Sequence, residues 1–254
     1  MQKYERYDKK IIISGNIIEV YEYEKEVASG FKISEGRIGR SGKAEGEEIQ
    51  KNRELVLQRA KRDLRRIINS NVDLYDELPK FFTMTFKEDM TCLKQANYEF
   101  KKFRQRLEDN IGIHLKYSAV PEIQKERFKK YGQAVWHYHV IFYNLPYIKQ
   151  SKLMEIWGNG GVNIKKIDKV DNVGAYMCKY MTKDNKDLVG QKCYFGSRGL
   201  YKPIVIKDKK LVESVRGSLQ ANKMVYQNIF ENEFNKTLYS QYNMIREQSE
   251  EKVV

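Results

Sequence analysis

The sequence predicts an α+β fold in which an antiparallel β-sheet is flanked by helices, as in ferredoxin-like and RNA-recognition folds. From Lys80 to Thr182, strand-like alternation and helix-like spacing of apolar residues follow one another in the order β-α-β-β-α-β-α. We expect the helices to cover one face of this sheet and to leave the other face accessible. The expected elements are strand Phe81–Phe86, helix Thr91–Leu107, strands Ile113–Val120 and Ala134–Tyr143, helix Lys149–Trp157, strand Val162–Ile167 and helix Val173–Thr182.

Two other patterns precede this region. Residues 10–33 alternate apolar and polar positions on either side of Ser14-Gly15-Asn16, which predicts a β-hairpin. The glycine-rich stretch Ser34–Gly46 predicts a flexible loop, and Glu47–Asn69 predicts a basic amphipathic helix. We therefore expect an N-terminal hairpin appendage and loop (1–46), a main domain led by the basic helix (47–205) and a C-terminal extension (206–254).

The composition indicates a partner with negative charge. The chain has 254 residues and a formal net charge of +13, which favours binding to nucleic acid. No apolar run approaches the ~18 residues that span a bilayer, and no signal-peptide pattern is present, so we expect a cytoplasmic protein. The three cysteines have no CxxC spacing, which argues against a disulfide framework and a zinc ribbon.

Two of the three histidines lie two residues apart in Trp136-His137-Tyr138-His139. Because alternate residues of a strand project from the same face, His137 and His139 point together, while their neighbours face the core. Two imidazoles on one rigid strand can chelate a single metal ion. The bland reading is a pair of histidines on a solvated strand face.

The third ligand should be an oxygen donor on the neighbouring strand. Glu122 is the first candidate, because it ends the strand expected to pair with the histidine strand, and Gln124 is the fallback. Two histidines and a carboxylate also suit iron in an oxygenase or a cupin site. A cupin would have a glutamate three or four residues after the pair, where this chain has Phe142 and Tyr143, and this weakens the oxygenase reading.

A second pattern lies on the last expected helix. At helical spacing, Tyr176, Lys179, Tyr180 and Lys183 form one stripe of two phenols and two ammonium groups. Nearby positive charge favours the phenolate and holds a phosphate, so the stripe suits attack on a phosphodiester. An ordinary amphipathic surface would give the same stripe.

Together these segments resemble the HUH endonuclease superfamily, and in particular the rolling-circle replication initiators of small phages and bacterial plasmids. Phe81–Phe86 is similar to the first family motif, and His137-Tyr138-His139 to the second. The segment from Tyr176 to Lys183 is similar to the third motif in the two-tyrosine form of gene A proteins. Phe195-Gly196-Ser197-Arg198 is similar to a short element that follows the tyrosine helix in related initiators.

The resemblance implies an activity and its partners. A divalent metal, Mg or Mn, held by His137, His139 and Glu122 would bind the scissile phosphate, and Tyr176 or Tyr180 would attack it. The products would be a 5′-phosphotyrosine and a free 3′-hydroxyl on single-stranded DNA at a replication origin. Among the basic residues, we expect four to contact the DNA: Arg59, Arg62, Arg66 and Arg198. No P-loop is present, so a host helicase and a host DNA polymerase would be needed.

Two other classes of protein remain open. Relaxases and single-strand transposases share the histidine pair, but a relaxase usually has its nucleophile ahead of the histidines and a transposase needs only one tyrosine. A non-catalytic single-stranded nucleic-acid-binding module would suit the RNA-recognition-like sheet, although the aromatic string that marks such modules is absent.

The charge predicts how DNA binding responds to salt. Affinity for a single-stranded oligonucleotide should fall as salt rises, because each neutralised phosphate contributes about 0.7 to the logarithmic slope. Fluorescence anisotropy over a salt series measures this slope. A flat response would show that the +13 charge plays no part in binding.

Overall fold

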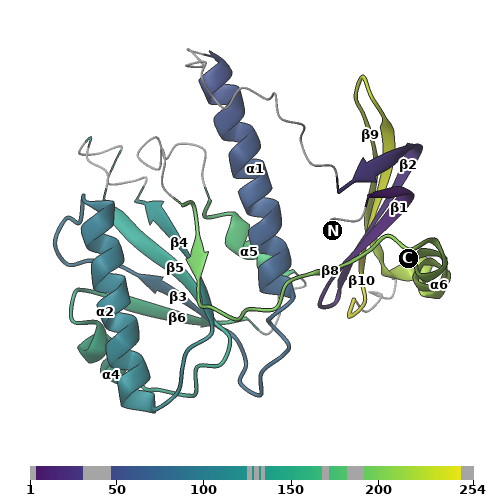
Figure 1. The fold of residues 1–254 in the computed structure, drawn as a ribbon. Helices are drawn as coiled ribbons and strands as arrows, with labels where there is room; N and C mark the ends of the chain where they lie inside the picture. Colours follow the sequence, from purple (N-terminus) through teal and green to yellow (C-terminus); the bar gives the residue numbers. More distant parts are fainter. Residues whose placement is uncertain are drawn as a thin grey trace, which may run out of the picture. The chain divides into compact units, whose positions relative to one another are not determined.

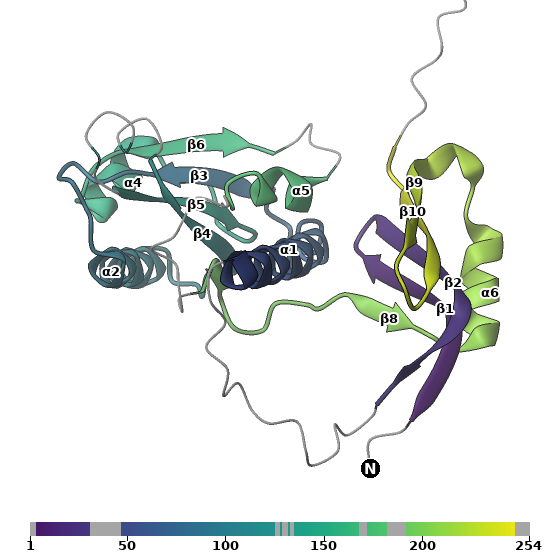
Figure 2. The ribbon, with the colours of Figure 1, turned by 90° about the horizontal axis from the view of Figure 1, so that it is seen from above.

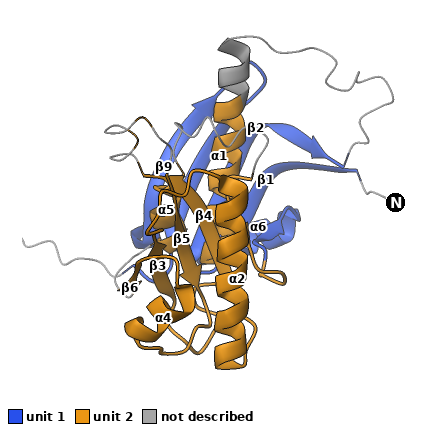
Figure 3. Ribbon diagram, turned by 90° about the vertical axis from the view of Figure 1, so that its left-hand side faces the viewer, with its two compact units in different colours: residues 1–51, 202–254 blue, residues 52–201 orange. Residues whose placement is uncertain are grey.

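The computed structural model describes residues 4–30, 47–124, 128, 132, 135–167, 172–181 and 192–246. The chain divides into two compact units, and Figure 3 colours them separately. Unit 1 comprises residues 1–51 and 202–254, and unit 2 comprises residues 52–201. The expected loop Ser34–Gly46 lies outside the described residues.

The α+β class is confirmed, since each unit contains an antiparallel five-stranded sheet with helices beside it (Figure 1). The elements of unit 2 follow the expected order. They are α1 (Glu47–Asn69), β3 (Lys80–Met84), α2 (Leu93–Ile111), β4 (Tyr117–Ile123), β5 (Trp136–Phe142), α4 (Gln150–Trp157), β6 (Val162–Lys166), α5 (Val173–Cys178) and β7 (Phe195–Gly196).

The sheet of unit 2 has the strand order β6-β3-β5-β4-β7, with every neighbouring pair antiparallel. The histidine strand β5 is therefore the central strand. It pairs with β3 on one side, where Thr83 opposes His139, and with β4 on the other, where Glu122 opposes His137. A central strand is held by hydrogen bonds along both edges, so its side chains have a well-defined direction.

Helices cover parts of both faces of this sheet, not one face as expected from the sequence. On one face, α2 and α4 pack over a core that includes Tyr138 and Val140 of β5. On the other face, Leu64 and Ile68 of α1 and Met177 of α5 pack over Phe81, Val120 and Ile141. The reason is that α1 and α5 have their own apolar stripes and must bury them. The histidine face is thus partly roofed by α1 and α5.

Unit 1 combines the two ends of the described chain. Its strands are β1 (Glu5–Ser14), β2 (Ile17–Ser29), β8 (Ile204–Ile206), β9 (Met224–Glu231) and β10 (Lys236–Asn243), in the order β8-β1-β2-β10-β9. The predicted hairpin is formed by β1 and β2, and Gly15 adopts a φ of 56° in its turn. Helix α6 (Lys209–Ser218) packs on one face of this sheet (Figure 2), and a 3-10 turn follows at Ala221–Lys223. The hairpin and the C-terminal segment therefore share one sheet.

Two boundaries differ from the sequence prediction. Strand β4 extends to Ile123, so Glu122 lies within the strand. Pro121 has no N–H to donate, but β7 pairs only with Ser118 and Ala119, so Pro121 leaves no partner unsatisfied on that side. Helix α5 ends at Cys178, earlier than the expected Thr182, which lies outside the described residues.

No helix in the described part of the chain combines the length and apolar character that crossing a membrane requires.

The contact between α1 and α5 depends on a glycine. A Cβ at Gly174 would lie 2.3 Å from the Arg65 carbonyl oxygen and 2.8 Å from Oδ1 of Asn69. The Gly174 backbone N–H donates to the same Asn69 oxygen over 2.8 Å. Only glycine permits this approach of the two helix backbones.

We predict that Gly174→Ala destabilises unit 2 by about 1–3 kcal/mol, because the added methyl group pushes α5 off α1. Both tryptophans of the chain, Trp136 and Trp157, are buried in this unit, so denaturant unfolding followed by their fluorescence reports it. Gly217→Ala is the control, because a Cβ there meets nothing within 4 Å. An unchanged transition in Gly174→Ala would show that the helices are not in close contact.

Candidate metal and tyrosine site

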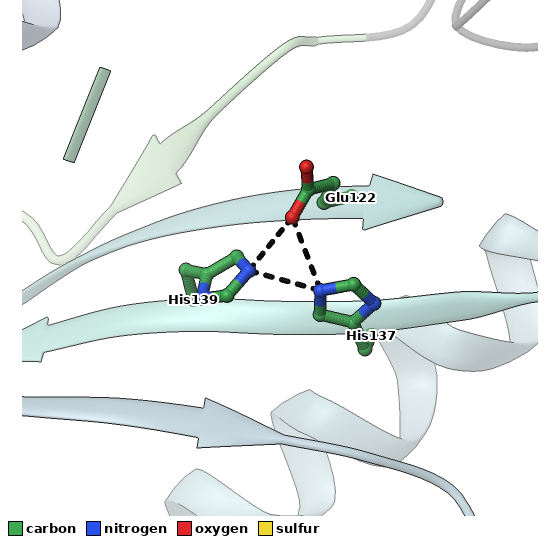
Figure 4. Close-up of side chains that lie close together, drawn as sticks. All are labelled: Glu122, His137 and His139. Atoms are coloured by element: carbon green, nitrogen blue, oxygen red, sulfur yellow. Dashed lines mark hydrogen bonds and ion pairs between the residues drawn. The ribbon is translucent and has the colours of Figure 1, made fainter. Parts of the chain in front are cut away.

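The pairing of β4 with β5 brings three potential metal ligands together. Glu122 lies directly opposite His137, and His139 projects from the same face two residues further along β5. Oε2 of Glu122 is 3.1 Å from Nε2 of His137 and 2.8 Å from Nε2 of His139, and the two Nε2 atoms are 2.9 Å apart. Figure 4 shows the three side chains pointing at one another, the carboxylate from β4 and both imidazoles from β5. Among the residues that the structure describes, this group could hold a metal ion.

The electrostatics keep the three groups in ligand form. Burial acts to raise the pKa of Glu122, but hydrogen bonds with His137 and His139 and the charges of both rings outweigh it and lower that pKa to about 2. Burial lowers the pKa of His139, although its hydrogen bond with Glu122 acts the other way. At neutral pH the site therefore offers an ionised carboxylate and a neutral His139 imidazole, the forms that bind metal.

Strand β3 fixes the orientation of His139. Oγ1 of Thr83 lies 3.3 Å from Nδ1 of His139, which leaves Nε2 turned toward Glu122. A hydrogen bond to the non-ligating ring nitrogen sets both the tautomer and the angle of a metal-binding histidine. His137 has no such support, because its buried Nδ1 has no hydrogen-bond partner.

The tyrosine segment lies directly against the triad of Glu122, His137 and His139. The ring of Tyr180 stacks on His139 with centroids 3.6 Å apart and planes at 23°. Phe81 borders both rings, at 5.4 Å from Tyr180 and 5.5 Å from His139. The Tyr180 hydroxyl donates to the Tyr176 hydroxyl over 3.1 Å, so both phenols meet beside the metal ligands although α5 ends before Tyr180.

The surroundings of Tyr180 raise the pKa of its phenol. Burial is the main cause, followed by its hydrogen bond to Tyr176 and the negative charge of Glu122. Lys179, expected to favour a phenolate, is exposed, and its Nζ lies 5.6 Å from the centre of the Tyr176 ring. Lys183 lies outside the described residues. Tyr180 thus keeps its proton more firmly than an ordinary tyrosine.

A polar junction holds the tyrosine segment on α1. Oδ1 of Asn172 caps α5 by accepting from the Ala175 N–H over 2.9 Å, and it also accepts from Nδ2 of Asn69 over 3.0 Å. Further along, Sγ of Cys178 donates to the Lys61 carbonyl over 3.1 Å. These contacts bind the start and the end of α5 to α1, so the position of the tyrosines depends on that helix.

The arginines predicted to bind DNA do not join this cluster. On α1 the positions of Arg59, Arg62 and Arg66 lie on the side opposite the buried Leu64 and Ile68. Arg198 is exposed in the turn after β7, where its carbonyl accepts from the Lys116 ammonium over 2.9 Å. Their role in DNA binding stays a prediction.

Sequence reasoning did not assign roles to several residues that shape the site. Thr83 and Phe81 belong to a motif that the sequence analysis singled out, but their contact with His139 depends on the register between β3 and β5. Asn69 and Asn172, which are 103 residues apart, gave no pattern that would predict their hydrogen bond. Residues far apart in the sequence had to be placed by the fold before these partners could be recognised.

Comparison with known proteins gives one family. Residues 79–185 match the family model of the replication-associated protein ORF2. This segment begins just before β3 and includes the triad and both tyrosines. No curated protein and no solved structure matches the chain. The part of the chain that carries the site is thus similar to replication-associated proteins, which supports a role in initiating replication.

We predict that His137→Ala, His139→Ala and Glu122→Ala each weaken Mn²⁺ binding by about 100-fold or more, since even second-shell partners typically account for 10–100-fold. Isothermal titration calorimetry measures the affinity, and tryptophan fluorescence checks that unit 2 stays folded. Gln124→Ala is the control, because Gln124 follows the end of β4. If only Gln124→Ala weakens binding, the oxygen ligand is Gln124 and not Glu122.

Proposed function

We propose that this protein is a rolling-circle replication initiator, a metal-dependent endonuclease that nicks and rejoins single-stranded DNA through tyrosine. The observation that carries this proposal is the stack of Tyr180 on His139, within a segment similar to replication-associated proteins. A purely structural histidine pair would not require two phenols and a carboxylate at the same place.

The donor set fits a divalent ion of the Mg or Mn type. An octahedral ion with bonds of about 2.1 Å separates neighbouring donors by about 3.0 Å, whereas a tetrahedral zinc ion separates them by about 3.4 Å. The distances among the triad atoms are 2.8, 2.9 and 3.1 Å, close to the octahedral value. When bound, the ion would supply Lewis acidity at the scissile phosphate and positive charge beside the phenols.

The tyrosines would supply the nucleophile. The phenol oxygen forms a bond to phosphorus and loses its proton, while the bond from phosphorus to the 3′-oxygen breaks and that oxygen gains a proton. The result is a 5′-phosphotyrosine and a free 3′-hydroxyl. Because the phosphodiester is exchanged and not hydrolysed, the 3′-hydroxyl can attack the phosphotyrosine later and restore the DNA strand.

The raised pKa of Tyr180 indicates that its phenol is protonated in the resting site. Part of that rise comes from the charge of Glu122, so neutralising this carboxylate makes the proton easier to remove. Activation of the tyrosine would then be linked to occupancy of the triad. This link would limit cleavage outside the loaded complex.

Two hydroxyls within 3.1 Å of each other suit a transfer between strands. A small shift of α5 or of the DNA would present either oxygen to the same phosphate. One tyrosine can then hold a cut end while the other begins a second attack. Unwinding and synthesis would come from a host helicase and a host DNA polymerase.

We predict that Tyr176→Phe and Tyr180→Phe each retain some covalent adduct with an origin oligonucleotide and that the double variant forms none. Denaturing gel electrophoresis with labelled oligonucleotide and Mn²⁺ measures the adduct, and peptide mapping identifies the attachment. Tyr194→Phe is the matched control, because this tyrosine of the same unit has no ring contact with the triad.

Two results would change the proposal. Complete loss in one single variant with a normal second variant would show that the enzyme uses one nucleophile and that no transfer between tyrosines occurs. Adduct formation by the double variant would exclude the tyrosine segment from catalysis. DNA binding without any adduct in the unmodified protein would instead favour the non-catalytic nucleic-acid-binding module.

A further inference from the structure

Unit 1 has an aromatic surface that the nicking reaction does not use. Ile18 and Val20 of β2 face α6, so Tyr21 and Tyr23, which alternate with them, lie on the opposite face of the sheet. Cross-strand pairing places Tyr239 beside Tyr21, and Asn228 beside Tyr239. The aromatic face therefore comprises rings from β1, β2, β9 and β10: Tyr7, Tyr21, Tyr23, Tyr226, Phe230 and Tyr239.

These rings are in contact across the sheet. Tyr21 lies 5.0 Å from Tyr239 between ring centroids, and Tyr239 lies 5.9 Å from Tyr226 and 6.1 Å from Phe230. Tyr23 lies 6.4 Å from Tyr21, with planes only 14° apart. The result is a row of rings several strands wide, longer than one cross-strand pair needs for stability.

Hydrogen bonds make the central rings lean along the sheet. The Tyr239 hydroxyl donates to the buried carboxylate of Glu19 over 2.9 Å and lies 3.1 Å from Oε1 of Gln241, two residues along its own strand. The Tyr21 hydroxyl likewise reaches Glu19, two residues back along β2, over 3.4 Å. A ring tethered in this way leans over the sheet and turns a face outward.

Two lysines place positive charge among these rings. Nζ of Lys10 lies 4.5 Å from the centre of the Tyr21 ring, and Nζ of Lys207 lies 5.0 Å from the centre of the Tyr7 ring. At the far end of the row, Tyr226 and Phe230 are 47% and 52% exposed. Exposed rings beside ammonium groups match the alternation of bases and phosphates in a single strand.

We propose that the aromatic face of unit 1 binds single-stranded DNA by base stacking and holds the strand during reactions at the triad. The choice of DNA rests on the proposed function, whereas the stacking does not depend on nicking. A protein partner is the competing occupant, but it would not require cations beside the rings.

The test compares the two faces of strand β9. Tyr226→Ala combined with Phe230→Ala removes the two exposed rings, and Ile229→Ala removes a side chain that lies between them in sequence, faces the other way and is 54% exposed. The probe is a labelled thymidine 20-mer in EDTA, so that neither metal nor cleavage contributes. Affinity is measured by anisotropy over a salt series.

We expect the double variant to bind at least about ten-fold more weakly at every salt concentration, with an unchanged slope, since stacking removes no phosphate contact. Ile229→Ala should follow the unmodified protein. The proposal is overturned if the double variant also follows it, or if Ile229→Ala loses as much affinity. Loss of slope would also overturn it, because the substitutions would then have disturbed charged contacts elsewhere.

A second measurement does not depend on substitution. A 20-mer containing 5-iododeoxyuridine is crosslinked by light to the unmodified protein, and the linked peptides are mapped. Crosslinks at Tyr226 or Phe230 support the proposal, whereas crosslinks confined to residues 52–201 overturn it. Neither result depends on adduct formation by Tyr176 and Tyr180, so failure of the nicking proposal would be seen separately.

Discussion

The candidate site depends on the register between β4 and β5. Glu122 opposes His137 only in this alignment, and a shift by one residue would turn the carboxylate to the opposite face of the sheet. The register is strongly specified because both faces of β5 are buried, with Tyr138 and Val140 in one core and Ile141 in the other. The packing of apolar residues thus sets the spacing of the polar ones.

Helix α1 has a role that extends beyond its charge. Its apolar side roofs the histidine face, and Asn69 near its end binds both the cap of α5 and the backbone of Gly174. Asn71, just beyond the helix, exchanges hydrogen bonds with the backbone of Tyr201 over 2.9 and 3.0 Å. The same short segment therefore supports the tyrosines and fixes the point where the chain leaves unit 2.

The sequence allowed the elements to be predicted better than their contacts. The boundaries of α1 and the turn of the hairpin followed from local pattern and glycine chemistry. The three ligands were predicted because a spacing of two on a strand has a single geometric meaning, and Glu122 was near the end of the neighbouring strand. Long-range contacts such as the stack of Tyr180 on His139 and the bond of Thr83 to His139 depend on packing between distant segments. Local periodicity cannot reveal such contacts, nor that β2 pairs with β10.

The composition of unit 1 from two distant segments has a consequence for how the chain folds during synthesis. Strands β1 and β2 emerge from the ribosome first, yet β2 lacks its partner β10 until Lys236–Asn243 has been made. Unit 2, in contrast, is one continuous segment, and domains generally fold as they emerge. The triad would then be assembled while the hairpin still has an open edge. Closure of the second sheet would be the last step, which makes the completed unit 1 a mark of a fully translated chain.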